Sequence, residues 1–328
     1  MHSRSLGKSI LLSRFSVAVL ALVLLPQLAR AQWQASVGAQ SKDLGRQALA
    51  FLPNELWIHA GDSVTWTAVT DEPHTITFLA NGQVRPPFAV GCPGFSPSGS
   101  TFDGSTCVDT PPLGPGQSFT VEFPTAGNYK LACLFHEQMT GSVHVLDPSL
   151  PLPHDQEFYD KQAREQGVAL LAQAVPGSHH EHGAHDHLSV TVGGGTVTAT
   201  GAGKQTFSLM RFTGDTIVIH AGDTVTWTNT DSITPHTVTF GVEPANPIPP
   251  AGNITTDPDG ALHAVLNSTS DSAHSGFLVA DAQDRIGLPQ VPLGITRFRI
   301  TFTRPGVYPY ICALHDGLGM KGKVIVLH

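Results

Sequence analysis

The sequence predicts an all-β protein with two β-sandwich domains, and three observations carry this prediction. The 328-residue chain is rich in turn-forming residues, with 33 glycines and 25 prolines, a composition that suits β structure better than helices. Short runs of β-branched or aromatic residues alternate with polar ones, as at 64–67 (VTWT) and 75–78 (TITF). Short strands with turn signals at this spacing indicate an antiparallel sandwich. The third observation is that the second half of the chain repeats the first.

The composition also excludes several classes of protein. Charged residues make up 13% of the chain, and the formal net charge is −8. These values are not typical of a disordered chain, a coiled coil or a nucleic-acid-binding protein, so we expect no nucleic-acid partner. Four cysteines are too few for a disulfide scaffold of this length, whereas 17 histidines are unusually many.

Residues 1–31 have the pattern of a signal peptide. A basic start precedes an uncharged apolar run at 17–25, and residues 29–31 (ARA) fit the small-x-small cleavage rule. The run is too short to span a bilayer, and an uncleaved anchor is the alternative interpretation. We expect an exported protein, periplasmic or secreted, that is not inserted in a membrane after cleavage and has access to an oxidising compartment.

The internal repeat sets the domain boundaries. Residues 56–66 have the sequence LWIHAGDSVTW, and residues 217–227 have the sequence IVIHAGDTVTW. Each copy continues with a Pro-His pair in a strand-like run and ends in a Tyr-x3-Cys-x2-His pattern. Such self-similarity indicates two homologous domains, which we place at 32–150 and 188–328.

Residues 151–187 are expected to join the two domains. Within them, 155–174 have a helical composition, whereas 177–187 are polar and are expected to form a flexible linker. A His-rich tract of this kind binds Cu(II), Zn or Ni loosely, or it is only a pH-responsive spacer, and both interpretations remain open. The histidines of this tract are His179, His180, His182, His185 and His187.

Each repeat carries side chains that suit a mononuclear copper site. Two imidazoles and a thiolate form a trigonal plane around copper, and a thioether is a weak axial ligand. Zinc is the alternative metal, although a thioether is a poor zinc ligand, and a buried thiol beside a surface histidine is the alternative without metal. The candidate ligands are His74, Cys133, His136 and Met139 in the first repeat and His236, Cys312, His315 and Met320 in the second.

The two remaining cysteines lie in a Gly/Pro/Ser-rich loop of the first domain. Cys92 and Cys107 have fourteen residues between them. In an exported protein such a pair is expected to form a disulfide. The alternative is a second thiolate metal pair, which lacks histidines nearby in the sequence.

These motifs resemble the cupredoxin family over almost all of the chain after residue 31. The Cys312-x2-His315-x4-Met320 loop is similar to that of plastocyanin, and the shorter Cys133-x2-His136-x2-Met139 loop resembles that of amicyanin. The resemblance implies two Greek-key β-sandwiches, one type 1 (blue) copper in each, and electron transfer with a redox partner protein. It also implies that His136 and His315 are the electron ports. The last loop of a sandwich lies at one end of the barrel, so these side chains are expected to reach the surface. Their apolar neighbours Leu134, Phe135, Leu314 and Leu318 indicate a patch that docks the partner.

Enzymes among the multi-domain relatives differ from this sequence at one position. Multicopper oxidases and copper nitrite reductases place a histidine directly before the cysteine ligand, where this chain has Ala132 and Ile311. We therefore expect an electron carrier rather than an enzyme. A copper storage, delivery or resistance protein is the alternative, favoured by the His-rich linker, and an oxidase or nitrite reductase is the weaker one.

Overall fold

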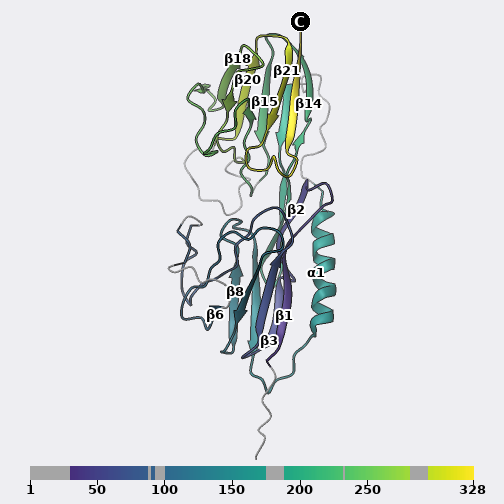
Figure 1. Ribbon diagram of the computed structural model, residues 1–328, viewed down its shortest axis with the longest axis vertical. Coiled ribbons are helices and arrows are strands. Elements are labelled where there is room, and N and C mark those ends of the chain that lie inside the picture. Colours follow the sequence, from purple (N-terminus) through teal and green to yellow (C-terminus); the bar gives the residue numbers. More distant parts are fainter. Residues whose placement is uncertain (1–29, 88–89, 93–99, 175–187, 232, 281–294) are drawn as a thin grey trace, which may run out of the picture. The chain divides into compact units, whose positions relative to one another are not determined.

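Each repeat of the chain folds into two β-sheets (Figure 1). The computed structural model describes residues 30–87, 90–92, 100–174, 188–231, 233–280 and 295–328. All of the signal segment except its last two residues, and the His-rich tract at 179–187, lie outside the described residues, so what was predicted for them stays a prediction. Within the described ranges, strands make up nearly all of the regular structure and one α-helix is present, which confirms the all-β class.

The first repeat contributes to a seven-stranded sheet and a four-stranded sheet. Their strand orders are β11-β12-β2-β1-β4-β7-β6 and β3-β9-β8-β5. The strands of this repeat are β1 (Gln32–Gln40), β2 (Arg46–Leu52), β3 (Glu55–His59), β4 (Ser63–Ala68), β5 (Thr77–Phe78), β6 (Ser100–Thr101), β7 (Ser118–Glu122), β8 (Gly127–Ala132) and β9 (Thr140–Leu146).

The second repeat builds a six-stranded and a five-stranded sheet. Their strand orders are β13-β10-β15-β20-β18-β17 and β14-β22-β21-β16-β19. The strands of this repeat are β10 (Ser189–Val192), β11 (Gly195–Ala199), β12 (Lys204–Leu209), β13 (Phe212–Thr213), β14 (Thr216–His220), β15 (Thr224–Asn229), β16 (Thr239–Phe240), β17 (Thr255–Thr256), β18 (Leu262–Leu266), β19 (Ala273–His274), β20 (Arg297–Phe302), β21 (Gly306–Ile311) and β22 (Lys321–Leu327).

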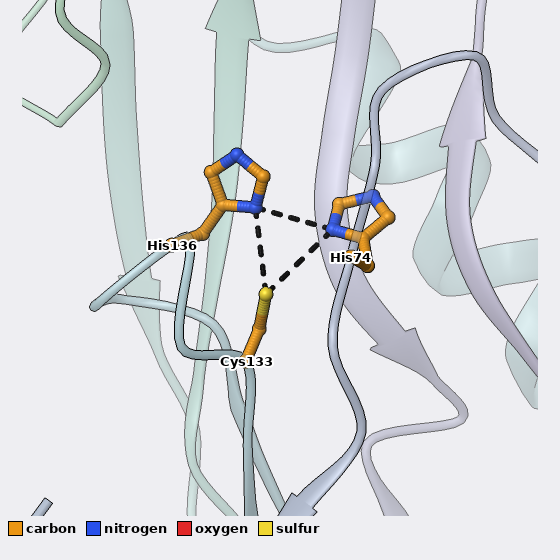
Figure 2. A group of neighbouring side chains, drawn as sticks. All are labelled: His74, Cys133 and His136. Atoms are coloured by element: carbon orange, nitrogen blue, oxygen red, sulfur yellow. Dashed lines mark hydrogen bonds between the residues drawn. The ribbon is translucent and has the colours of Figure 1, made fainter. Parts of the chain in front are cut away.

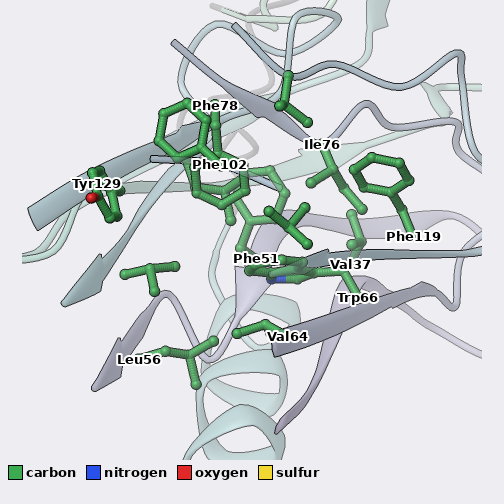
Figure 3. Close-up of a cluster of buried hydrophobic side chains, with 14 of the residues drawn as sticks. Val37, Phe51, Leu56, Val64, Trp66, Ile76, Phe78, Phe102, Phe119 and Tyr129 are labelled. Carbon is green, nitrogen blue, oxygen red and sulfur yellow. The ribbon is translucent and has the colours of Figure 1, made fainter. Parts of the chain in front are cut away.

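Alternation along the strands produces one hydrophobic core in each repeat. In β4 and in β15, every second side chain is buried and the others are half-buried. Trp66 packs in the first core with its ring centroid 5.5 Å from that of Phe78 (Figure 3). In the second core, Trp227 packs at the same distance from Phe240. Burying a large apolar side chain stabilises a fold by roughly 1.5–3 kcal/mol, so these aromatic clusters hold the two sheets of each sandwich together.

The sheets are mixed, although the short alternating runs suggested antiparallel pairing. β1 runs parallel to β4 and β3 runs parallel to β9, and the second repeat pairs β10 with β15 and β14 with β22 in the same way. Period-2 alternation fixes which face of a strand is buried. It does not fix the direction of the neighbouring strand, so this feature could not be predicted locally.

The predicted helix is present and covers part of the first sandwich. α1 (Gln156–Leu171) begins after Asp155, whose carboxylate accepts a hydrogen bond from the backbone N–H of Phe158 at 3.0 Å. Such an N-cap satisfies a backbone donor that the helix itself leaves unpaired. The buried Gly167 lets the helix lie close to β1 and β2, because a Cβ there would stand 3.3 Å from Ala39.

One strand pairing joins the two repeats. β12 of the second repeat runs antiparallel to β2 of the first, with Phe207 opposite Ala48. The guanidinium of Arg46 lies 4.4 Å from the centroid of the Phe207 ring, a cation–π distance. The β11–β12 hairpin thus extends a sheet of the first repeat, and residues 31–328 form one compact unit.

The loop cysteines are bonded to each other, as predicted. Cys92 and Cys107 form a disulfide between residues separated by 15 positions. Cys133 and Cys312 are free and buried. The disulfide cross-links the long loop before β7 without using a candidate metal ligand.

Replacing both Cys92 and Cys107 with Ser is expected to lower the free energy of unfolding by about 3 kcal/mol, because the unfolded chain then regains the freedom of an open loop. Urea unfolding of the variant and of the wild-type protein measures this difference. Wild-type protein unfolded in the presence of a thiol reductant is the control and should show a matching loss. An unchanged unfolding midpoint in both cases would contradict the prediction.

Candidate metal centres

The local structure places three candidate ligands of each repeat on one loop. In the first repeat, Cys133 directly follows β8, and His136 and Met139 lie before β9. In the second repeat, the corresponding loop connects β21 to β22. The fourth ligand comes from a separate segment, since His74 and His236 precede the short strands β5 and β16 and form isolated bridges with Leu113 and Leu278.

The first centre brings three side-chain atoms close together (Figure 2). The Nδ1 atoms of His74 and His136 are 3.1 Å apart, and they lie 4.0 and 3.6 Å from Sγ of Cys133. All three residues are buried. The structure therefore gathers these predicted ligands, which come from positions up to 62 residues apart.

The second centre repeats this geometry. The Nδ1 atoms of His236 and His315 are 3.1 Å apart, and they lie 4.0 and 3.4 Å from Sγ of Cys312. These residues are also buried. Met139 and Met320 are fully buried in the cores of their repeats, in the loops that carry the cysteines.

The donor set fits one transition-metal ion in each centre. A point between three atoms at these separations is roughly 2 Å from each of them, which is the length of a bond from such a metal to nitrogen or sulfur. Two imidazoles with one thiolate are soft and borderline ligands, and this combination suits copper. The residues present therefore fit a copper ion without any rearrangement of the chain.

Comparison with known proteins agrees with this donor set. The family model described as copper binding proteins, plastocyanin/azurin family, matches residues 39–146 and 198–327. The chain belongs to this copper-binding family. Because the model matches two separate regions, the protein is a tandem cupredoxin.

Individual relatives each match about a third of the chain. This chain is 35% identical over 114 residues to the chloroplastic plastocyanin of Tetradesmus obliquus, and the alignment covers 34% of this chain and 69% of that protein. The chain is 31% identical over 110 residues to the plastocyanin of Synechococcus sp. (strain JA-2-3B'a(2-13)), and this alignment covers 34% of this chain and 59% of that protein. A solved structure of a reduced amicyanin variant is 23% identical, with a TM-score of 0.24, and covers 35% of this chain and 82% of its own.

Backbone hydrogen bonds close the ligand loop in both cupredoxin repeats. The N–H of Cys133 donates to the carbonyl of Met139 at 3.0 Å, and the N–H of Cys312 donates to the carbonyl of Met320 at 3.0 Å. Inside the first loop, the N–H of Met139 donates to the carbonyl of His136. These bonds fix the cysteine, histidine and methionine relative to one another although the two loops differ in length.

A threonine next to the upstream histidine anchors the loop from outside. The hydroxyl of Thr75 accepts the N–H of Leu134 at 2.7 Å, and the backbone N–H of Thr75 lies 3.4 Å from Sγ of Cys133. Thr237 makes the same two contacts with Ala313 and Cys312. The N–H groups stabilise negative charge on the sulfurs, since hydrogen bonds to a charged acceptor are stronger than neutral ones.

The outward ring nitrogens have different partners in the two repeats. Nε2 of His236 lies 3.3 Å from the carboxylate of the buried Asp231, which also accepts a hydrogen bond from the hydroxyl of Ser208. Nε2 of His74 is buried without a hydrogen-bond partner among the described residues. Such outer partners fix the orientation of a ligand and tune its basicity, so the two centres are not equivalent.

Without metal, the shifted pKa values favour a thiolate beside a protonated imidazole, His136 in the first centre and His236 in the second. Burial acts to raise the pKa of Cys133 and Cys312, but hydrogen bonds and charge from the neighbouring histidines outweigh it and keep the pKa of both thiols well below its usual range. Burial likewise opposes protonation of His136, yet its bonds to Cys133 and Glu72 raise its pKa to about 10. Burial opposes protonation of His236, but its bonds to Asp231 and Cys312 raise its pKa to about 9. The thiolate is the form that binds metal, and the metal displaces the imidazole proton.

The two histidines predicted as surface electron ports are buried. His136 is 6% exposed and His315 is 4% exposed. Of their apolar neighbours, Phe135 is 37% exposed, whereas Leu318 is buried. The prediction of exposure was wrong because it treated each loop as the free end of a separate sandwich, and here contacts with the other repeat cover both loops.

Glu72 is the residue of the site that the sequence analysis missed. One oxygen of its buried carboxylate lies 3.2 Å from Nε2 of His136, and the other lies 3.8 Å from Nε2 of His315. Burial acts to raise its pKa, but the hydrogen bond to His136 and the charges of the nearby histidines lower that pKa to about 2. The available signal was a difference between the repeats, since Glu72 precedes the Pro-His pair where the second repeat has Thr234.

Thr75→Val is expected to destabilise the first repeat by about 1–3 kcal/mol, because the buried N–H of Leu134 then loses its acceptor. Urea unfolding of the metal-free protein measures the loss. Thr67→Val is the matched control, since its hydroxyl bonds to Ser118 on the exposed face of β4 and β7. Equal effects of the two substitutions would contradict an anchoring role for Thr75.

Proposed function

We propose that this protein is an exported electron carrier with one type 1 copper in each repeat. The observation that carries the proposal is the buried His–Cys–His cluster, which both repeats form with Nδ1–Nδ1 distances of 3.1 Å. Membership of the copper-binding plastocyanin/azurin family supports copper as the metal. Export is supported by the signal pattern of residues 1–31.

The ligand arrangement favours electron transfer over simple metal binding. Two imidazoles with one thiolate suit both Cu(I) and Cu(II), so neither oxidation state is strongly preferred. The loop hydrogen bonds and the threonine anchors hold the ligands in place without metal. A centre that does not rearrange between oxidation states exchanges an electron with little structural change.

An enzyme is less well supported than a carrier. Ala132 and Ile311 occupy the positions directly before the cysteine ligands, where the oxidases and nitrite reductases to which cupredoxins are related carry a histidine. We therefore propose no catalytic copper. Storage or delivery of copper is also less well supported, because Cys133 and Cys312 are completely buried and a cargo metal has to leave its site readily.

The redox partner is proposed to be a protein that contacts the surface beside the first centre. Phe135 is 37% exposed and its ring centroid is 6.2 Å from that of His136. Small apolar contacts of this kind suit transient redox complexes.

No helix in the described ranges is long and apolar enough to cross a membrane.

Cys133→Ser and Cys312→Ser are each expected to remove about half of the blue thiolate-to-copper absorption and one of two bound copper ions, because the thiolate is both a ligand and the source of the colour. Metal counting and visible spectra of the copper-loaded variants check this. Loss of all the absorption in either single variant would show that only one repeat holds a blue copper.

Phe135→Glu is expected to slow electron exchange with the partner while the copper spectrum stays unchanged, because a charge at the contact raises the cost of desolvating it. Stopped-flow oxidation by candidate partner proteins gives the rate. Val218→Glu, at another exposed apolar position in the second repeat, is the control. Equal rates for the two variants would place the contact elsewhere.

A further inference from the structure

We propose that Glu72 connects the two metal centres, so that His136, Glu72 and His315 form an internal route for electrons between the repeats. The proposal rests on the proposed function, since it needs a redox metal in each centre. Its basis is the placement of one carboxylate between the outward nitrogens of two ligand histidines, at 3.2 Å and 3.8 Å.

The route is short because both histidines use Nδ1 toward the metal position. In each ring this leaves Nε2 as the outward atom, and both Nε2 atoms face the same carboxylate. Between the two rings, the route therefore leaves covalent bonds at two points. These are the hydrogen bond between His136 and Glu72 and the close contact between Glu72 and His315. All three side chains are at most 9% exposed, so little water enters between the centres.

Contacts between the repeats hold the ligand loops on either side of this route. On the first loop, Gln138 accepts a hydrogen bond from Lys204 at 2.8 Å through its side chain and one from Thr206 at 3.1 Å through its carbonyl. On the second loop, the carbonyl of Leu318 accepts a hydrogen bond from Arg211, which also donates to the carbonyl of Asp43. Each loop is thus fastened by residues that belong to, or bridge to, the opposite repeat.

The route also explains why the burial of His136 and His315 is compatible with electron transfer. In an isolated sandwich each of these side chains would end at the surface and meet an external partner. Here Nε2 of His136 meets Glu72 of its own repeat, and Nε2 of His315 meets the same carboxylate from the other repeat. The second centre thus takes the place of that partner. In the proposed step one electron leaves a Cu(I) centre and arrives at a Cu(II) centre, no bond forms or breaks, and the Nε2 protons stay on their rings.

The position of Glu72 makes the two centres unequal. Its carboxylate is closer to His136 than to His315, and a negative charge stabilises the more positive oxidation state most strongly at short range. The first centre is therefore expected to have the lower reduction potential of the two as far as this residue is concerned.

The test uses the full chain loaded with copper in both centres. A brief substoichiometric reduction distributes electrons over both, and the absorption then reports their redistribution. Spectra of Cys133→Ser and Cys312→Ser give the signature of each centre. In the wild-type protein we expect a redistribution phase whose rate is independent of protein concentration, and this phase should be absent from both single-centre variants.

Two substitutions at Glu72 then test the bridge. Glu72→Val, which removes the polar link, should slow the redistribution by about tenfold or more with both blue bands retained, because the hydrogen-bonded connection is gone. Glu72→Gln keeps the shape but removes the charge, and it should raise the potential of the first centre more than that of the second. Spectroelectrochemistry of the two bands measures these potentials. This second test uses Glu72→Gln, so it remains valid even if Glu72→Val does not fold.

Glu137→Gln is the matched control, because it removes the same charge from the residue that follows His136. It should leave the redistribution rate unchanged, because Glu137 does not lie between His136 and His315 in the proposed route. A rate in Glu72→Val equal to the wild-type rate, or equal potential shifts at both centres in Glu72→Gln, would overturn the bridge while leaving the proposed function intact. Absence of two blue bands in the wild-type protein would instead overturn the proposed function.

Discussion

The closed loop between the last two strands of each sandwich is the constraint on which the rest of the site depends. It has to hold a thiolate, an imidazole and a thioether within a few residues and in one buried place. The hydrogen bond from the cysteine N–H to the methionine carbonyl closes the loop, and an anchoring threonine fixes it from the segment that carries the distant histidine. The sandwich supplies the walls, and the loop sets the geometry of the centre.

Burying this donor set is costly unless its charges are compensated, because an unpaired buried charge is strongly unfavourable. Backbone N–H groups point at both sulfurs, and carboxylates contact the outward nitrogens of His136 and His236. The compensation comes from different sequence positions in the two repeats, since Asp231 serves His236 whereas Glu72 serves His136. Duplication thus kept the ligands and the threonine anchors, but not the carboxylates that contact the outward nitrogens.

The sequence predicted what depends on local spacing and could not predict what depends on contact between the repeats. The paired motifs led to the two sandwiches and named the ligand clusters that the structure brings together. Local composition predicted the helix near 155–174, and the two loop cysteines predicted the disulfide. The parallel strand pairs, the joining of β12 to β2 and the burial of His136 and His315 depend on neighbours far away in the chain. No periodicity within a strand or loop encodes these neighbours.

Covering the outward histidines changes what a tandem cupredoxin is suited to do. A single sandwich with its second histidine at the surface exchanges electrons with whatever docks there. In this chain the same atoms face one carboxylate of the first repeat. The bond from Thr206 to Gln138 fastens the first loop across the repeats, and Arg211 links the second loop to Asp43 of the first repeat. Beside the first loop, the apolar surface that remains exposed is at Phe135. In the proposed route, a fixed internal contact replaces one of the two transient ones. The order of the two potentials, rather than docking alone, would then decide the direction in which electrons move.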